Sequence, residues 1–420
     1  MLVLISLSCT FVEPAAEPPT LRERFGDHAF LTPIDAPPTV ALVAGGELDT
    51  RASTCGGCHA EHYRDWSQST HAAAVHDVQF LAELAKPDQP RWLCLNCHAP
   101  TAPQRAETIT ADTRLASADS ILALQTTPNP TYDRLRTAEG VTCASCHVRR
   151  DTDGAGTVVG PRGSGRAPHR VRHDPTALDA VCVSCHSPGT DIVITPTFPC
   201  WFGTAEELAA GPAAGTTCVD CHMPSAERAI VVDGAVQPIR RHTWAGSGIA
   251  KTTAGLTTAA ERGFVSGLDV ALASTTVTLT NARAGHALPT GDPERFLLVE
   301  ATLRDDAGTV LAADSLRIGQ SWDWGDEATA RPARRTDDNR LGPGEIRVWT
   351  PRLSGGGGKM AVRVTSVRLT ADNAAEMGKV TLDAELHALW PELPSSLSAP
   401  MAGYPRSIVV FEGAIVRDPT

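Results

Sequence analysis

The chain has 420 residues, a length that suits two or three domains. Its formal net charge of −11 argues against nucleic acid as a partner, and no run approaches the roughly 20 apolar residues of a membrane-spanning helix. Aromatic residues make up only 5% while Gly (35) and Pro (31) are abundant, so the chain has limited means of building a conventional hydrophobic core.

Residues 1–45 have the composition of an export leader followed by a Pro-rich tether. Cys9 follows a short apolar run, as the lipidated cysteine of a bacterial lipoprotein does, although no Lys or Arg precedes the run. The first interpretation is a lipid anchor at Cys9; an uncleaved or mis-started export signal is the alternative. Residues 10–45 are rich in Pro, Ala and acidic residues, which is typical of a tether or a lead-in along the protein surface.

Residues 46–262 contain five copies of Cys-x-x-Cys-His, the attachment motif of haem c. In each copy two thiols bond the porphyrin covalently, and the adjacent His ligates the iron from the proximal side. The paired cysteines are Cys55 and Cys58, Cys94 and Cys97, Cys143 and Cys146, Cys182 and Cys185, and Cys218 and Cys221; the proximal histidines are His59, His98, His147, His186 and His222. Since bacteria attach haem to cysteine outside the cytoplasm, we expect an exported protein, in the periplasm or at the outer surface.

Three other interpretations of these cysteines are weaker. Half of a zinc site does not require the following His, a redox-active dithiol does not repeat five times, and a disulfide framework does not explain the fixed two-residue spacing. The predicted cofactors are therefore five covalently bound haem c groups. The first cysteines of successive motifs are 39, 49, 39 and 36 residues apart, so the haems must pack against one another. Cys200 belongs to no motif and is expected to be a buried structural thiol.

The sixth ligand of each iron decides between electron transfer and chemistry. Nine histidines lie outside the motifs, and five suffice for bis-His ligation of every haem. The strongest candidates for distal ligands are His71, His242 and His286; one of His169 and His173 is expected to ligate; His76 is a weaker candidate; and His28, His62 and His387 are expected not to ligate.

The position of His71 follows from a predicted helix over residues 60–76, which holds good helix formers and neither Gly nor Pro. His71 is twelve residues beyond His59, or about 18 Å along such a helix at about 1.5 Å per residue. His71 is therefore expected to serve a haem other than that of His59.

The pattern changes in residues 263–420, which hold no further Cys. Short apolar runs at 268–272, 276–280, 296–303, 346–349, 361–369 and 407–416 alternate with polar residues, as strands do. The fold class predicted for the chain is an α-helical, irregular multihaem domain followed by an all-β, Ig-like sandwich. His286 lies in a loop that leaves one of these strands and would ligate a haem across the domain boundary.

At these residues the chain resembles multihaem cytochromes c. The stretch from Cys55 to Trp66-x-x-Ser-x-x-His71 is similar to the opening module of cytochromes related to hydroxylamine oxidoreductase and its tetrahaem electron acceptor, in which the equivalent of His71 ligates another haem. Cys218 to His242-Thr-Trp resembles their closing part, and Gly285-His286-x-Leu-Pro-Thr-Gly resembles a β-domain appended to bacterial multihaem cytochromes. No Cys-x-x-Cys-Lys site is present, and no Tyr lies in a recognisable cross-linking setting, which argues against an enzyme.

The sequence favours a pentahaem cytochrome c that relays electrons through packed, mostly bis-His haems of low potential, with no catalytic residues assigned. Its expected partners are other redox proteins, with contact to a membrane only through a lipid on Cys9. Two alternatives stay open. One is a reductase or oxidase of a small nitrogen or sulfur species at one five-coordinate haem. The other is a homo-oligomer in which the haems continue along a filament.

Overall fold

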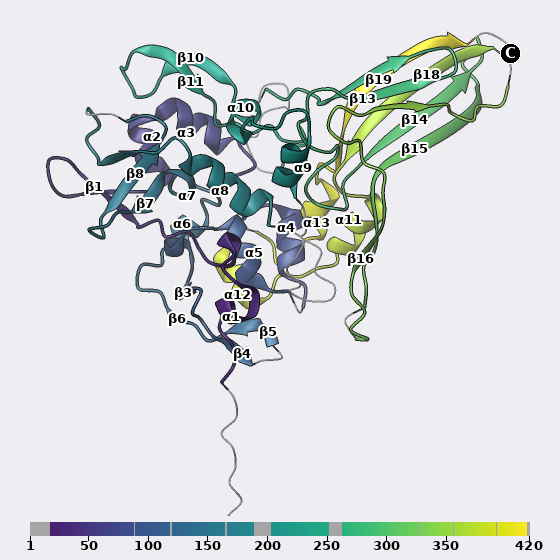
Figure 1. Cartoon of the computed structure of the whole chain (residues 1–420). Coiled ribbons are helices and arrows are strands. Elements are labelled where there is room, and N and C mark those ends of the chain that lie inside the picture. The colour runs from purple at the N-terminus through teal and green to yellow at the C-terminus, as the bar shows by residue number, and fades with distance from the viewer. Residues whose placement is uncertain are drawn as a thin grey trace, which may run out of the picture.

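The computed structural model describes residues 17–417, apart from 88, 118–119, 164–165, 189–202, 252–262, 327, 356 and 392. Figure 1 shows a part built of short helices and small sheets, and an elongated β-rich part that projects from it. Cys9 and Cys200, for which the sequence predicts roles, lie outside the described residues. Within the described ranges, no helix has the length and apolar character that a membrane crossing requires.

Short helices carry the five motifs of the N-terminal part. The helices are α1 (Leu21–Phe25), α2 (Ala52–Cys58), α3 (Ala60–Ser67), α4 (Val78–Leu84), α5 (Arg91–His98), α6 (Arg134–Thr137), α7 (Cys143–His147), α8 (Ala177–His186), α9 (Thr204–Ala210) and α10 (Cys218–His222), with 3-10 turns at Ala29–Leu31 and Ala102–Gln104. Each motif forms or ends one of them, namely α2, α5, α7, α8 or α10. Side chains three apart share a helix face, so both thiols of a motif point to the same side.

The N-terminal part also contains five small sheets that periodicity did not predict. The antiparallel pairs are β1 (Thr39–Ala41) with β2 (Glu47–Asp49), β3 (Glu107–Thr108) with β6 (Thr127–Pro128), β4 (Leu115–Ser117) with β5 (Ser120–Leu124), and β10 (Ser225–Ala229) with β11 (Val236–Arg240). The remaining sheet joins β7 (Val148–Arg150), β8 (Gly156–Gly160) and β9 (Val171–His173). Strands of two to five residues are too short to show a clear alternation of apolar and polar residues.

Residues 17–45, expected to form a tether, pack into the protein over much of their length. Leu21 is fully buried and Leu31 nearly so, in an apolar cluster with Trp92, Leu93 and Leu115. The Thr20 side chain caps α1 and Glu23 bonds back to the Thr20 backbone, which fixes where this helix begins. This segment therefore forms part of the folded domain.

Two antiparallel sheets make up the β-rich part. The smaller has the order β12 (Leu268–Leu272), β13 (Val277–Asn281), β17 (Ile346–Trp349), and the larger has the order β16 (Arg334–Asp338), β15 (Val310–Asp323), β14 (Phe296–Arg304), β18 (Gly358–Val367), β19 (Ser407–Arg417). Val277 and Leu279 from the smaller sheet share one core with Val299, Ile318 and Val362 from the larger. The two sheets thus pack face to face, and the expected strands are present with small shifts at their ends.

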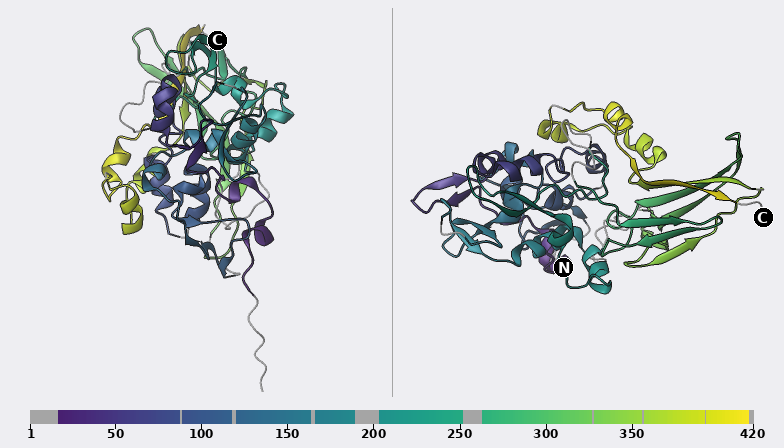
Figure 2. Two further views of the ribbon diagram at one scale, coloured as in Figure 1. Left: turned by 90° about the vertical axis from the view of Figure 1, so that its left-hand side faces the viewer. Right: turned by 90° about the horizontal axis from the view of Figure 1, so that it is seen from above.

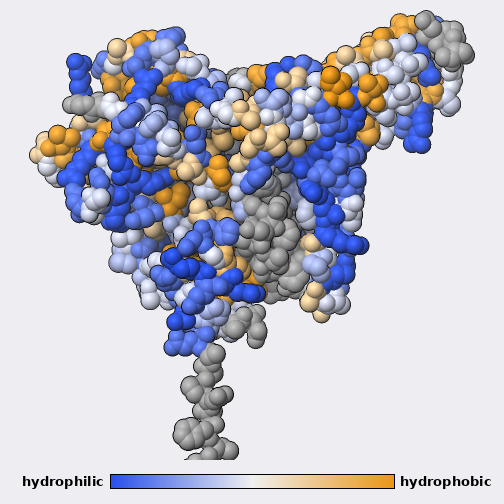
Figure 3. Space-filling model, viewed as in Figure 1, coloured by the Kyte–Doolittle hydropathy of each residue, from blue (hydrophilic) through white to orange (hydrophobic). Residues whose placement is uncertain are grey.

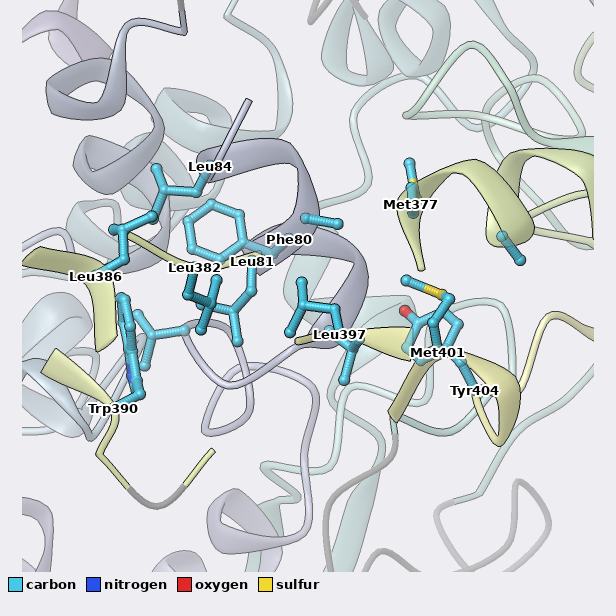
Figure 4. Close-up of a cluster of buried hydrophobic side chains, with 14 of the residues drawn as sticks. Phe80, Leu81, Leu84, Met377, Leu382, Leu386, Trp390, Leu397, Met401 and Tyr404 are labelled. Atoms are coloured by element: carbon cyan, nitrogen blue, oxygen red, sulfur yellow. The ribbon is translucent and has the colours of Figure 1, made fainter. Parts of the chain in front are cut away.

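Between β18 and β19 the chain leaves the sheet and returns to the N-terminal part. This excursion holds α11 (Ala371–Met377), α12 (Ala384–Leu389) and α13 (Ser398–Ala402), and the right-hand view of Figure 2 shows it in yellow. Its Trp390, Leu386 and Met401 pack against Phe80 and Leu81 of α4 (Figure 4). The two parts of the molecule therefore share a hydrophobic core.

Candidate functional site

A cavity of about 2390 Å³ extends through the N-terminal part to its boundary with the β-rich part. Its volume exceeds the roughly 300–1,000 Å³ of a single small-molecule site, so it suits several large groups. All ten motif cysteines and all five motif histidines line it, together with His62, His71, His169, His242 and His286. Because all five motifs line one cavity, the cavity suits a set of haems in contact with one another.

Four motif histidines each face a second histidine at one characteristic separation. The ring centres are 6.4 Å apart for His59 and His169, 6.2 Å for His147 and His242, 6.1 Å for His186 and His71, and 6.2 Å for His222 and His286. Two imidazoles that bind one metal from opposite sides have centres about 6 Å apart, because each metal–nitrogen bond is about 2 Å long and each nitrogen lies about 1 Å from its ring centre. The four pairs therefore have the spacing that bis-His haems need.

Hydrogen bonds at Nδ1 leave the other ring nitrogen available to a metal. The Nδ1 atoms of His59, His98 and His147 donate to the backbone carbonyls of Ile230, Ala74 and Val159, at 2.9, 2.8 and 3.0 Å. Nδ1 of His169, His242 and His286 likewise lies 3.3, 3.1 and 3.0 Å from a carbonyl oxygen. A proton fixed on Nδ1 leaves Nε2 as an unprotonated ligand.

Burial favours the neutral imidazole that a metal requires. It lowers the pKa of His71 and of His242 to about 3, and that of His186 to about 4, with neighbouring histidines adding to the effect. Burial therefore keeps His71, His186 and His242 uncharged near neutral pH.

The motif that ends at His98 differs from the other four. Among the described residues, which include every histidine of the chain, the aromatic ring in contact with His98 is Phe80, stacked at 3.8 Å. Lys251 and Asp77 are the charged groups that act on the His98 pKa. The sequence predicted five distal histidines, whereas the described residues contain four such histidine pairs. His98 of the second motif instead has Phe80, Lys251 and Asp77 as neighbours.

Two of the remaining histidines form a hydrogen bond through Nε2, the nitrogen that a metal would need. Nε2 of His76 is 2.8 Å from the Ala138 carbonyl oxygen, and Nε2 of His387 is 3.0 Å from that of Leu393. This use of Nε2 favours a structural role for His76, whose tentative assignment as a ligand finds no support. His173 is exposed on β9, so His169 is the better placed of the two alternatives before the fourth motif.

The predicted single helix over 60–76 is wrong, and the break matters for His71. The helix α3 ends at Ser67, and residues 69–76 form turns whose carbonyls bond to other segments. Gly140 lies against this turn, where a Cβ would come within 2.7 Å of the His71 carbonyl oxygen. The turn directs His71 to His186, in agreement with the expectation that it serves a haem other than that of His59.

Contacts between the motif thiols give an order for the five sites. The sulfur atoms of Cys55 and Cys143, of Cys97 and Cys185, and of Cys182 and Cys218 lie near one another. In addition, the helices α7 and α8 of the third and fourth motifs are in contact. The haem sites therefore follow the order first, third, fourth. The second and the fifth sites both lie beside the fourth.

Two residues that support this arrangement, Trp244 and Asp65, were not among the site residues predicted from the sequence. Trp244 contacts both His71 and His242, with ring centres 4.6 and 5.2 Å away, and so joins the third and fourth sites. Asp65 is buried on α3 and accepts hydrogen bonds from Arg228 (2.7 Å), Arg241 (3.2 Å) and the His242 N–H (2.9 Å). The sequence Arg-His-Thr directly before Trp244 was the available signal for that residue. No sequence pattern marked Asp65.

Replacing Asp65 by Ala is expected to lower the free energy of unfolding by about 2–3 kcal/mol, because it leaves Arg228 uncompensated in the interior. The value lies below that for a fully buried pair, since the Arg241 side chain is 32% exposed. The same change frees the backbone of His242 and should alter the visible spectrum of one haem. Urea denaturation and absorption spectra measure both effects. Asp27→Ala, at a 69% exposed ion pair, is the control; equal effects from both variants would contradict the prediction.

Comparisons with known proteins agree with this picture. Residues 54–121 match the model of the family described as cytochrome c554 and c-prime. A solved structure, a penta-heme cytochrome c552 from Thermochromatium tepidum, superposes with a TM-score of 0.52 at 20% identity, covering 88% of this chain and 98% of that one. A search of curated proteins gives no match. With its five Cys-x-x-Cys-His motifs, the chain is a multihaem c-type cytochrome with five covalently bound haem c groups.

Proposed function

We propose that this cytochrome is an electron relay in which four haems have bis-His ligation. The four histidine pairs at 6.1–6.4 Å carry the proposal. Bis-His ligation holds haem potentials low, whereas a His/Met pair would raise them. The haems supply reversible one-electron chemistry, and the chain supplies their ligands, their order and their exclusion from water.

The thiol contacts support a conducting path from the first haem through the third to the fourth, where it branches to the second and the fifth. Trp244, between His71 and His242, fills the space between two of these haems with an aromatic ring. Because the fifth haem would take His286 from the β-rich part, electrons could leave the path beside that part. We propose redox proteins as its partners.

Electron paramagnetic resonance of the oxidised protein tests the ligation. The proposal expects four low-spin haems per chain. Stopped-flow reduction followed by mixing with an acceptor cytochrome tests the relay, and all five haems are expected to reoxidise together. Fewer than four low-spin haems, or reoxidation of only part of the haem, would contradict it.

A second function, chemistry at one haem, is favoured by the second site alone. His98 faces no histidine among the described residues, and Lys251 and Tyr404 lie nearby as polar groups. A reductase or oxidase of a small nitrogen or sulfur species would use such a haem. Carbon monoxide added to the reduced protein tests whether the second haem has an open position. Rapid binding of one equivalent is required for the enzyme, and no binding excludes it.

The missing histidine also fits a filament in which a neighbouring copy supplies a ligand. Sedimentation at increasing concentration tests this arrangement, because a filament grows with concentration whereas a relay of fixed size does not. Apolar side chains at the outer end of the β-rich part, with Val416 70% and Val310 49% exposed, suit contact with a partner (Figure 3). We favour the relay with separate redox partners.

We further propose an exported protein of the periplasm or the outer surface, anchored through a lipid on Cys9. The haem motifs support export, and the short apolar run before Cys9 supports the anchor. We also propose that the two packed sheets are an Ig-like sandwich, and that the haem part is related to the cytochromes around hydroxylamine oxidoreductase. Mass spectrometry of the mature N-terminus, which detects a diacylglyceryl group on Cys9, tests the anchor.

A further inference from the structure

Two arginines from the β-rich part reach the haem cavity near the second and fourth motifs. Arg295 immediately precedes β14, nine residues after His286, and Arg368 immediately follows β18. Both line the cavity. The β-rich part therefore contributes charged groups to the cavity as well as a histidine.

The surroundings of Arg295 and Arg368 place them between two haem sites. Arg295 acts electrostatically on His186, the proximal histidine of the fourth motif, and also on Lys251. Lys251 is in turn the first charged side chain to act on His98, the proximal histidine of the second motif. Arg368 acts on Lys251 and lies over the Tyr404 ring at 4.5 Å.

Two arginines in this region form no ion pair with a described residue, although Asp292 and Glu294 also line the cavity and Asp77 acts electrostatically on Arg368. Lys251 forms a buried ion pair with Asp77, whose other oxygen accepts from the Tyr404 hydroxyl at 2.6 Å, so these two charges cancel. The guanidinium groups of Arg295 and Arg368 remain as two positive charges, because arginine does not lose its proton in proteins. Among the described residues, neither forms an ion pair with a carboxylate.

Both arginines also have a buried donor without a partner. The Nε atoms of Arg295 and Arg368 are inaccessible to solvent and make no hydrogen bond with any described residue. Buried donors are ordinarily satisfied. Arg51, Arg228 and Arg417 also have an unpartnered Nε, but only Arg295 and Arg368 of these five arginines line the cavity, where a negatively charged acceptor could reach them. Haem c brings two propionate carboxylates per group, which are acceptors of that kind.

We propose that Arg295 and Arg368 pair with haem propionates in the cavity, and that the charge of Arg295 raises the potential of the haem at the fourth motif, so that electrons collect where the path branches. This inference rests on the proposed relay. A cation beside a haem stabilises the reduced form, because oxidation adds a positive charge to the iron. The effect is large where the region is buried, since water screens such a pair little. The fourth haem adjoins the third, the second and the fifth in the order given above, so its potential affects every branch of the path.

Arg295→Gln is the test variant, because the Arg295 side chain makes no hydrogen bond within the described structure that its loss would break. A potentiometric titration followed by visible and electron paramagnetic resonance spectra is expected to show a shift to more negative potential for one or two haems. The other haems should keep their potentials, and the spin states should not change. Arg295→Lys retains the charge and should restore part of the shift.

Arg352→Gln serves as the matched control, since it removes the same group from the β-rich part at a 92% exposed side chain. Arg368→Gln is a weaker test, because Arg368 also donates to the backbone carbonyls of Ala250 and Pro405, and its loss loosens the fold. Unchanged potentials in a fully loaded Arg295→Gln protein, or a shift equal to that of Arg352→Gln, would overturn the inference. A protein that fails the four-low-spin test contradicts the relay, whereas the potential shift is read independently of it.

Discussion

Replacing His286 by Ala is expected to convert one haem of the five from low spin to high spin. His286 faces His222 with ring centres 6.2 Å apart and ring planes 13° apart, and its Nδ1 is engaged by the Ala287 carbonyl. Loss of the imidazole removes the sixth ligand of the fifth haem and leaves the other three histidine pairs intact. Electron paramagnetic resonance and the visible spectrum of the oxidised protein measure the change. Added imidazole is expected to restore the low-spin state by entering the vacated space.

The control is the same substitution at His387, which uses Nε2 in a hydrogen bond to the Leu393 carbonyl and lies outside the cavity. His387→Ala is expected to leave all spectra unchanged. If His286→Ala also leaves them unchanged in a protein with five haems, the β-rich part supplies no ligand and the assignment of His286 is wrong.

Trp390→Ala is expected to lower the free energy of unfolding by about 3 kcal/mol. Trp390 is fully buried in the core that joins the C-terminal helices to α4 (Figure 4), and removal of such a side chain costs about 3–5 kcal/mol. The expected value is at the lower end of this range, because the Trp390 indole N–H has no hydrogen-bond partner among the described residues. Its burial without a partner destabilises the folded state, and the substitution removes that cost. Thermal unfolding followed by circular dichroism measures it.

Trp324→Ala provides a comparison at a tryptophan that is 38% exposed and stacked on Trp322 at 5.6 Å. Its loss should cost about 1 kcal/mol, the value of an aromatic pair. A Trp390→Ala protein no less stable than Trp324→Ala would show that the C-terminal helices contribute little to the haem part.

Features that depend on local sequence were predictable here. A motif of five residues with fixed spacing identifies the haem attachment sites, and alternation over four or more residues gave β12, β13, β14, β17, β18 and β19. The polar strand β15 was missed, because exposed polar residues such as Ser315 and Arg317 interrupt its apolar face. The helices α11 to α13 were missed because each spans seven residues or fewer, too short for a clear period.

The pairing of ligands could not be predicted, since it depends on contacts between distant segments. His71 and His186 are 115 residues apart, and the turn that joins them follows from the end of α3 at Ser67 and from the close approach of Gly140. The sequence named His71, His242 and His286 as candidates but not their partners. It also expected a fifth pair, whereas His98 stacks on Phe80 beside charged groups.

The helices α11 to α13 follow all five haem motifs in the chain, which bears on the order of events during maturation. A chain made from its N-terminus exposes all ten motif thiols before the segment that covers α4 has been synthesised. Covalent attachment can thus proceed on an open polypeptide, while the last residues close the domain around groups already bound. A chain cut short before residue 371 would keep its haem sites yet leave Phe80 and Leu81 without their cover.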